Sequence, residues 1–210
     1  MDIAIIGAGK VGAGIARAWA KAGHAIRYGL RDPAAARYRP LAATGALLAP
    51  AEAAAGAAAI LLATPWPATE AAIAALGDLT GKLLLDATNP LAMGPEGLGL
   101  AIGHTQSGGE RVAAWARGAS TFKTLNSTGF EVLGDTQGYP QPPVMFVAGD
   151  DAARKPAVLG LVGELGFAPV DAGPLRNARL LEAHAMLWID LALQRGQGRD
   201  FAFGLMRRAG

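Results

Sequence analysis

A glycine-rich turn near the start of the chain limits the possible folds more than any other feature of the sequence. The apolar run 2–6 leads directly into Gly-Ala-Gly-Lys-Val-Gly at 7–12, and a segment with helical character follows at 11–22. A buried strand, a G-x-G-x-x-G turn and a helix in this order are typical of dinucleotide-binding units. A tight turn that binds nothing is the alternative, but the alternation of strands and helices along the chain favours a nucleotide.

Each glycine of this turn has its own role in the predicted site. Gly7 permits the tight turn, Gly9 lets the backbone approach a pyrophosphate, and Gly12 allows the helix to pack closely against the strand. Lys10 and Val11 stand where the helix begins, and its N–H groups and positive dipole end favour phosphate groups. Lys10 either adds a point charge to that site or remains solvated.

The residues after the second predicted strand indicate which dinucleotide is bound. An NAD-preferring site ends this strand with Asp or Glu, but here the expected position falls near Leu30, which cannot accept a hydrogen bond. Arg31 offers a guanidinium suited to a phosphate, and Arg37 could approach from the next segment, so we predict NADP(H). Two other roles remain for Asp32: it binds the ribose, or it caps a helix that begins at Pro33.

Apolar runs and helical segments alternate along the whole chain, which favours a doubly wound, mostly parallel α/β sheet with helices on both faces. We expect one domain over 1–210, since no repeat or linker is evident. The expected strands are 2–6, 25–29, 47–48, 58–63, 82–86, 121–125, 144–148 and 168–171. The expected helices are 11–22, 33–44, 51–55, 68–75, 107–117, 152–165 and 175–195, with a glycine-rich loop at 94–103.

Three predicted strands end in small hydrogen-bonding residues beside prolines. In open α/β sheets ligands bind outside the carboxyl ends of the strands, so these residues should build the wall of a crevice. Such residues are also ordinary turn formers, but three at corresponding positions strengthen the case. The residues are Thr64-Pro65-Trp66-Pro67, Thr88-Asn89-Pro90 and Asn126-Ser127-Thr128.

Composition argues against several other functions. The net charge is +2 and the basic residues form no run, which gives nucleic-acid binding little support. The absence of cysteine rules out disulfides and thiolate chemistry and fits a reducing, cytoplasmic compartment. The apolar segment 41–63 is interrupted by Pro50, Glu52 and Gly56, so it favours a helix and a strand over a membrane span. The first residues lack the basic leader of a signal peptide.

No catalytic group stands out in the sequence. The three histidines, His24, His104 and His184, are scattered and suggest no metal site. We expect His24 to be structural and His184 to be packed, whereas His104 lies on a loop that could face the crevice. The catalytic residues therefore stay unassigned.

The last predicted helix carries two apolar stripes. Leu180, His184, Leu187 and Leu191 form one of them, and Leu181 and Trp188 belong to the other. A helix that is apolar on two sides is expected to be buried on both, by core packing, by a roof over the crevice or by a dimer partner.

Six stretches, spread over almost the whole chain, resemble the NADPH-dependent reductases of the 8-hydroxy-5-deazaflavin coenzyme F420. They are GAGKVGAGIARAWAKAGH, GLRDP, LLLDATNPL, STFKTLNSTG, MFVAGDD and DAGPLRNARLLEAHAMLWIDLAL. The resemblance implies a compact, dimeric protein that binds NADP(H), with a deazaflavin (coenzyme F420) or a flavin (FMN or FAD) stacked on the nicotinamide.

The same resemblance places seven residues at cofactor positions: Gly7, Gly9, Gly12, Arg31, Thr64, Pro65 and Asn89. Pro90 and Asn126, at the strand ends described above, complete the predicted site. The chain departs from the family pattern at Leu30, where a small hydroxyl residue is common, and Trp66-Pro67 would narrow the nicotinamide end.

Three functions fit these observations. The first is an oxidoreductase that moves a hydride between NADPH and a deazaflavin or flavin, which needs stacked rings rather than a general acid. The second is a reductase of a small carbonyl or imine, although that class adds a large helical domain for which little chain is left. The third is a redox-sensing module that binds NADP(H) without turnover.

Overall fold

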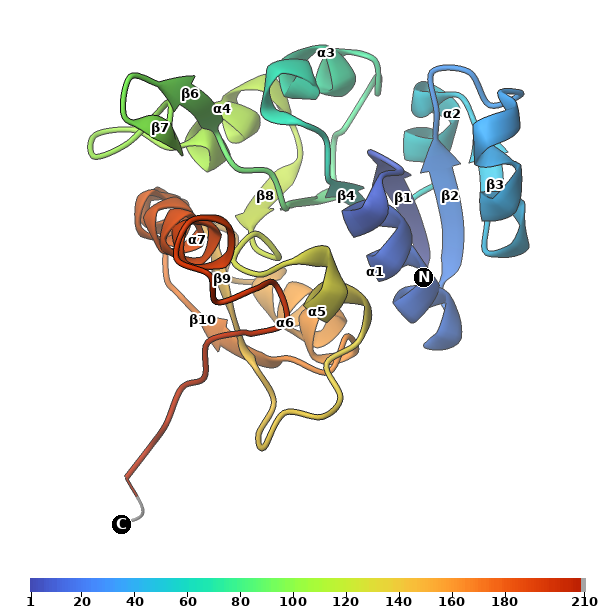
Figure 1. Ribbon diagram of the computed structural model, residues 1–210. Coiled ribbons are helices and arrows are strands. Elements are labelled where there is room, and N and C mark those ends of the chain that lie inside the picture. The colour runs from blue at the N-terminus through green and yellow to red at the C-terminus, as the bar shows by residue number, and fades with distance from the viewer. Residues whose placement is uncertain (209–210) are drawn as a thin grey trace.

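The computed structural model describes residues 1–208 and shows an α/β fold built around one large sheet (Figure 1). Eight strands pair in the order β10-β9-β8-β5-β4-β1-β2-β3, which confirms the predicted fold class. Their bounds are β1 Asp2–Ile6, β2 Ala25–Gly29, β3 Ala46–Leu48, β4 Ala59–Leu62, β5 Leu83–Asp86, β8 Ser120–Lys123, β9 Val144–Gly149 and β10 Ala168–Asp171.

All but one of the strand pairs in this sheet are parallel. The exception is β8 with β9, which pair antiparallel, while β9 and β10 run parallel to each other. Parallel neighbours need a crossover that returns along the sheet, usually on a helix. The connection from β8 to β9, residues 124–143, contains only the short helix α5 (Phe130–Gly134) and a proline-rich loop, so the chain reverses direction instead.

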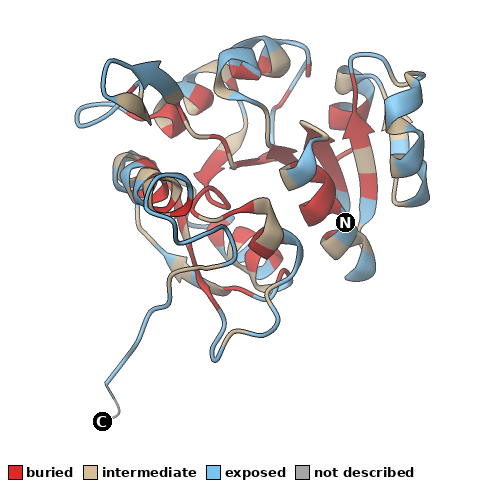
Figure 2. Ribbon diagram, in the orientation of Figure 1, coloured by how far each residue is buried: buried red, intermediate tan, exposed pale blue. Residues whose placement is uncertain are grey.

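Within residues 1–208, seven α-helices lie on the sheet or at its edges, and both faces of the central strands are buried. The remaining helices are α1 Lys10–Lys21, α2 Pro50–Ala55, α3 Thr69–Ala74, α4 Gly108–Trp115, α6 Lys155–Gly163 and α7 Ala178–Leu193, with 3-10 helices η1 Ala36–Ala43, η2 Trp66–Ala68 and η3 Leu175–Asn177. Ile3 and Ile5 belong to one core, and Ala4 and Ile6 to the other, as the alternation of a strand requires. Figure 2 shows the buried strands passing through the middle of the molecule.

Two segments differ from the sequence prediction. Residues 33–44 were predicted to be a helix, but they form a turn followed by the 3-10 helix η1, which contains Pro40. Proline removes an N–H donor and crowds the preceding turn, which disfavours an α-helix there. The loop predicted at 94–103 instead contains the second strand of a hairpin, β6 (Leu91–Gly94) and β7 (Gly97–Leu100), and Gly97 has the positive φ of +104° at its turn.

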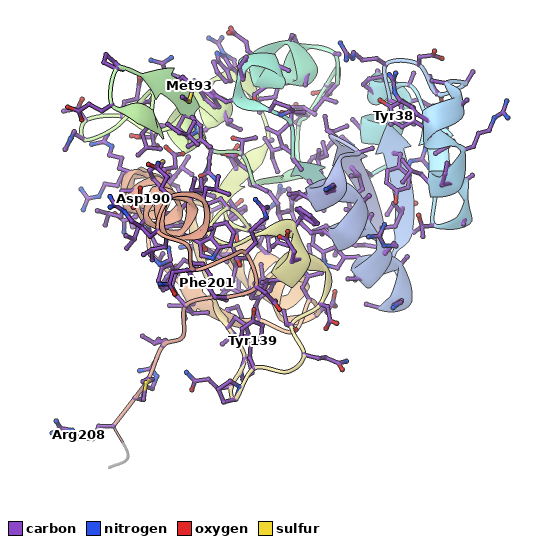
Figure 3. All side chains as sticks on the ribbon, in the orientation of Figure 1. Tyr38, Met93, Tyr139, Asp190, Phe201 and Arg208 are labelled. Carbon is purple, nitrogen blue, oxygen red and sulfur yellow. The ribbon has the colours of Figure 1, made fainter. Side chains whose placement is uncertain are left out.

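Within this chain helix α7 is buried on one side, so core packing covers only one of its two apolar stripes, and the burial of the other by a partner stays a prediction. Leu181 and Trp188 are buried, whereas Leu180 and Leu187 are 67% and 51% exposed. The segment after α7 folds back beside it, where Trp188 Nε1 donates to the Phe201 carbonyl at 2.9 Å and the two rings stack. In Figure 3, Phe201 lies beside α7 and Arg208 stands away from the body of the protein. None of the helices within residues 1–208 has the length and hydropathy needed to span a membrane.

Candidate functional site

A crevice of about 870 Å³ opens at the carboxyl ends of β1, β2, β4 and β5. Strand β1 pairs with β2 on one side and β4 on the other, so the crevice lies where the strand order reverses, which is the usual ligand position in such sheets. Nine of the twelve predicted site residues line it: Gly7, Gly9, Lys10, Val11, Arg31, Arg37, Thr64, Pro65 and Asn89. Gly12, Pro90 and Asn126 do not.

The glycine turn has the geometry that a phosphate-binding loop requires. Gly7 has a φ of +103°, and a Cβ there would collide with the carbonyl of Ala63. A Cβ on Gly12 would collide with the carbonyl of Gly7, so Gly12 serves helix packing rather than the lining. Apart from the residues next to it in the chain, no described residue comes within 4 Å of a Cβ built on Gly9, the N-cap of α1, and no side chain caps this helix. The first N–H groups of α1 are therefore available to a ligand.

One end of the crevice is basic. Arg31 and Arg37 both line it, and within residues 1–208 neither forms an ion pair. Leu30 is buried, and Arg37 stacks over the ring of Tyr38 at 4.7 Å. Asp32 accepts a hydrogen bond from Ala34 N at 3.2 Å and does not line the crevice. It therefore stabilises the turn, and it neither caps an α-helix nor lies where it could bind a ribose.

The other end carries uncharged polar groups. Asn89 Nδ2 donates to the Asn126 carbonyl at 2.9 Å, and Asn126 Nδ2 donates to Asn89 Oδ1 at 3.0 Å. Asn126 thus orients the lining residue Asn89 from behind. Thr64 Oγ1 and Thr69 Oγ1 lie 3.0 Å apart, and Trp66 packs on Trp115 with ring centres 5.6 Å apart. The lining also includes Tyr38 and two alanines of α3, Ala71 and Ala72. No pattern in the sequence indicated these residues.

A fully buried ionic cluster lies directly behind this polar end. Lys123 Nζ is 3.0 Å from both Asp86 Oδ2 and Glu182 Oε1, and it also donates to the Thr88 carbonyl. Asp86 Oδ1 accepts from the backbone N and the hydroxyl of Thr88. The cluster therefore fixes the turn that presents Asn89 to the crevice.

Glu182 connects this cluster to two helices. It stands on α7, and its two oxygens accept from Gly108 N at 2.8 Å and Gly109 N at 2.9 Å, at the first turn of α4. A carboxylate is favoured at a helix N-terminus, which offsets part of the cost of its burial. The sequence prediction assigned no role to these three ionic residues, although each of them stands within or at the end of an apolar run.

A second ion pair joins α7 to α4. Arg179 binds Glu110 with both Nε and Nη2, at 2.9 and 2.6 Å. The hydrogen bond from Arg179 lowers the pKa of the Glu110 carboxyl below its ordinary value. Ser107 Oγ accepts from Glu110 N, which confirms the predicted start of this helix.

The histidines lie outside the crevice. His24 Nε2 is 2.6 Å from Glu164 Oε2, and His184 packs against Phe146 and Phe203, where burial lowers its pKa. His104 is exposed and does not line the crevice. In the described part of the chain no group of three or more acidic or imidazole side chains is placed to hold a metal ion.

Comparison with known proteins gives a consistent result. The family described as "NADP oxidoreductase coenzyme F420-dependent" matches residues 2–90. A crystal structure from Arthrobacter sp. FB24, described as that of a candidate F420-dependent NADP reductase, is 33% identical, with a TM-score of 0.89 over 99% of this chain and 100% of that one. A hypothetical protein from Sinorhizobium meliloti is 27% identical over 85% of this chain and 88% of its own, with a TM-score of 0.73.

A longer enzyme shares the fold. A reductive aminase from Aspergillus terreus, solved with NADPH4, cyclohexanone and allyl amine, is 25% identical with a TM-score of 0.68. The match covers 93% of this chain but only 62% of the aminase. The similarity to the Arthrobacter protein extends over 99% of this chain, and the family match covers residues 2–90, which include the glycine turn. Together they show that this chain belongs to the coenzyme F420-dependent NADP oxidoreductase family.

Proposed function

We propose that this protein transfers a hydride between NADPH and a deazaflavin or flavin bound at the uncharged end of the crevice. The observation that carries the proposal is the chemical contrast between the two ends. Arg31 and Arg37 line the first, whereas the second is lined by Thr64, Pro65, Thr88, Asn89 and apolar side chains, without an ionisable group. Hydride transfer between two stacked rings requires that the rings be aligned, and it requires no acid or base. Uncharged polar and apolar side chains can align the rings.

The residues divide the work of binding. The N–H groups at the start of α1 would bind the pyrophosphate, and Arg31 with Arg37 would neutralise the 2′-phosphate of the adenosine. Asn89, held in place by its hydrogen bonds with Asn126, would orient the carboxamide of the nicotinamide. NADPH bound there would supply the hydride, and with one proton from solvent the acceptor would become its reduced form while NADP⁺ is left.

Two other functions remain as alternatives. Reduction of a small carbonyl or imine is favoured by the similarity to the aminase, but this chain spans only 62% of that enzyme's length. Binding of NADP(H) without turnover is compatible with the lack of ionisable groups at the polar end.

An anaerobic acceptor screen tests the proposal. On mixing NADPH-loaded protein with coenzyme F420, FMN or FAD, we expect the nicotinamide absorbance to fall in a single exponential phase. Oxidation of NADPH only by ketones or imines would support the carbonyl or imine reductase, and NADPH binding without any oxidation would support the sensor.

We also propose that the protein forms a homodimer through the open side of α7. Leu180, Ala183 and Leu187 are exposed at helical spacing, and Met93 of the hairpin that contacts α7 is 76% exposed. We expect light scattering to give twice the chain mass, and Leu187→Glu to give a monomer with an unchanged circular dichroism spectrum. A monomeric wild type would contradict this proposal, and Ala34→Glu, at an exposed position in the turn before η1, is the control.

A further inference from the structure

A second hollow, of about 420 Å³, shares residues of the glycine turn with the main crevice. Its lining consists of Ala8, Gly9, Lys10, Ala13, Arg17 and Phe130. Lys10, Ala13 and Arg17 are three and four residues apart on α1, so their side chains share one face of that helix. Phe130, the first residue of α5, forms the opposite wall.

Positive charge collects around this hollow. Lys10 Nζ lies 4.6 Å from the ring centre of Phe130, and the guanidinium of Arg199 lies 5.1 Å from the same centre. Arg199 is occupied by Glu131, with Nε and Oε1 2.7 Å apart. Burial is the largest single influence on Glu131 and raises its pKa, but the hydrogen bonds from Arg199 and from the backbone, together with the charges of Arg199 and Lys10, leave the pKa below its ordinary value. Lys10 and Arg17 form no ion pair within residues 1–208, although the charge of Lys10 lies near enough to Glu131 to lower the pKa of that carboxyl.

The hollow borders the crevice. Ala8, Gly9 and Lys10 line both spaces. The loop 126–129 begins at Asn126, which binds Asn89 at the uncharged end, and leads directly into Phe130. A ring bound at the uncharged end could therefore extend a side chain past the glycine turn toward Lys10 and Arg17.

We propose that this hollow binds the phosphate or carboxylate group on the side chain of the hydride acceptor, and thereby selects anionic flavins or deazaflavins over neutral ones. The inference rests on the proposed function, because it needs the acceptor ring in the crevice. A phosphate there could instead be the pyrophosphate of NADPH. Arg17 separates the two sources, since it lines the hollow but not the crevice.

FMN and riboflavin form a matched pair of probes, because they differ only in the phosphate. With NADP⁺-loaded protein, we expect calorimetry to show FMN binding about ten-fold more tightly than riboflavin at low salt, and this ratio to fall as ionic strength rises. Arg17→Gln is expected to bring the ratio close to one while the NADPH dissociation constant stays the same. Lys21→Gln removes the same charge from the far end of α1 and is the control, with an expected ratio near that of the wild type.

Each outcome bears on the inference. Equal binding of FMN and riboflavin by the wild type would overturn it. A loss of NADPH affinity in Arg17→Gln as large as the loss of FMN affinity would overturn it as well, in favour of the pyrophosphate. These are equilibrium measurements, so they remain informative if no flavin oxidises NADPH. In that case a preserved FMN preference would support the anion site while the proposed hydride transfer failed.

Discussion

Replacing Lys123 with methionine is expected to lower the free energy of unfolding by about 3–5 kcal/mol, because it leaves two carboxylates buried without their cation. Lys123, Asp86 and Glu182 are each no more than 1% exposed, so water cannot replace the lost partner. Urea denaturation followed by circular dichroism measures the change.

Two further variants separate charge from packing in this experiment. Adding Glu182→Gln to Lys123→Met removes one of the stranded charges and is expected to recover part of the stability. Lys155→Met is the control, since Lys155 pairs with Asp171, whose side chain is 53% exposed, and its loss should cost about 1 kcal/mol. If Lys123→Met were no more destabilising than Lys155→Met, the cluster would not stabilise the fold as described.

Replacing Arg31 with glutamine is expected to weaken NADPH binding by roughly 10- to 100-fold and to leave NADH binding nearly unchanged. The variant would lose a charged hydrogen bond to the 2′-phosphate, worth about 1.5–3 kcal/mol, that NADH never makes. Fluorescence titration of both nucleotides measures the two dissociation constants. Because only the ratio is interpreted, a general loss of folding would not imitate the effect.

Arg39→Gln provides the matched control for this prediction. Arg39 is an exposed arginine in η1 and does not line the crevice. Its removal should change both affinities by less than about three-fold, as expected for a screened surface charge. Equal losses for NADPH and NADH in Arg31→Gln would mean that Arg31 does not bind the 2′-phosphate.

The parts of the fold that follow local rules could be predicted from the sequence. Strands β1, β2 and β10 have the predicted bounds, because each is a short run between turn residues or caps. The glycine turn lies between strand and helix as predicted, since its pattern is set by backbone geometry that only glycine allows. Nine of the site residues could be placed on the crevice because the carboxyl ends of parallel strands meet at one edge.

The remaining features depend on contacts between distant segments. The antiparallel pairing of β9 is decided by the path of residues 124–143, and not by the composition of the strand itself. Lys123 lies in the middle of the predicted strand 121–125, and only its position beside Asp86 and Glu182 explains why a charged residue can be buried there. The second hollow requires α1 and α5 to be adjacent, which no local pattern indicates.

Calorimetric titration of the purified protein with NADPH and with NADH tests the central claim most directly. We expect one NADPH site per chain with micromolar affinity, and NADH binding at least ten-fold more weakly because NADH lacks the phosphate that Arg31 would bind. No heat with NADPH, or NADH binding as tightly as NADPH, would contradict the assignment of this crevice to a 2′-phosphorylated nicotinamide nucleotide.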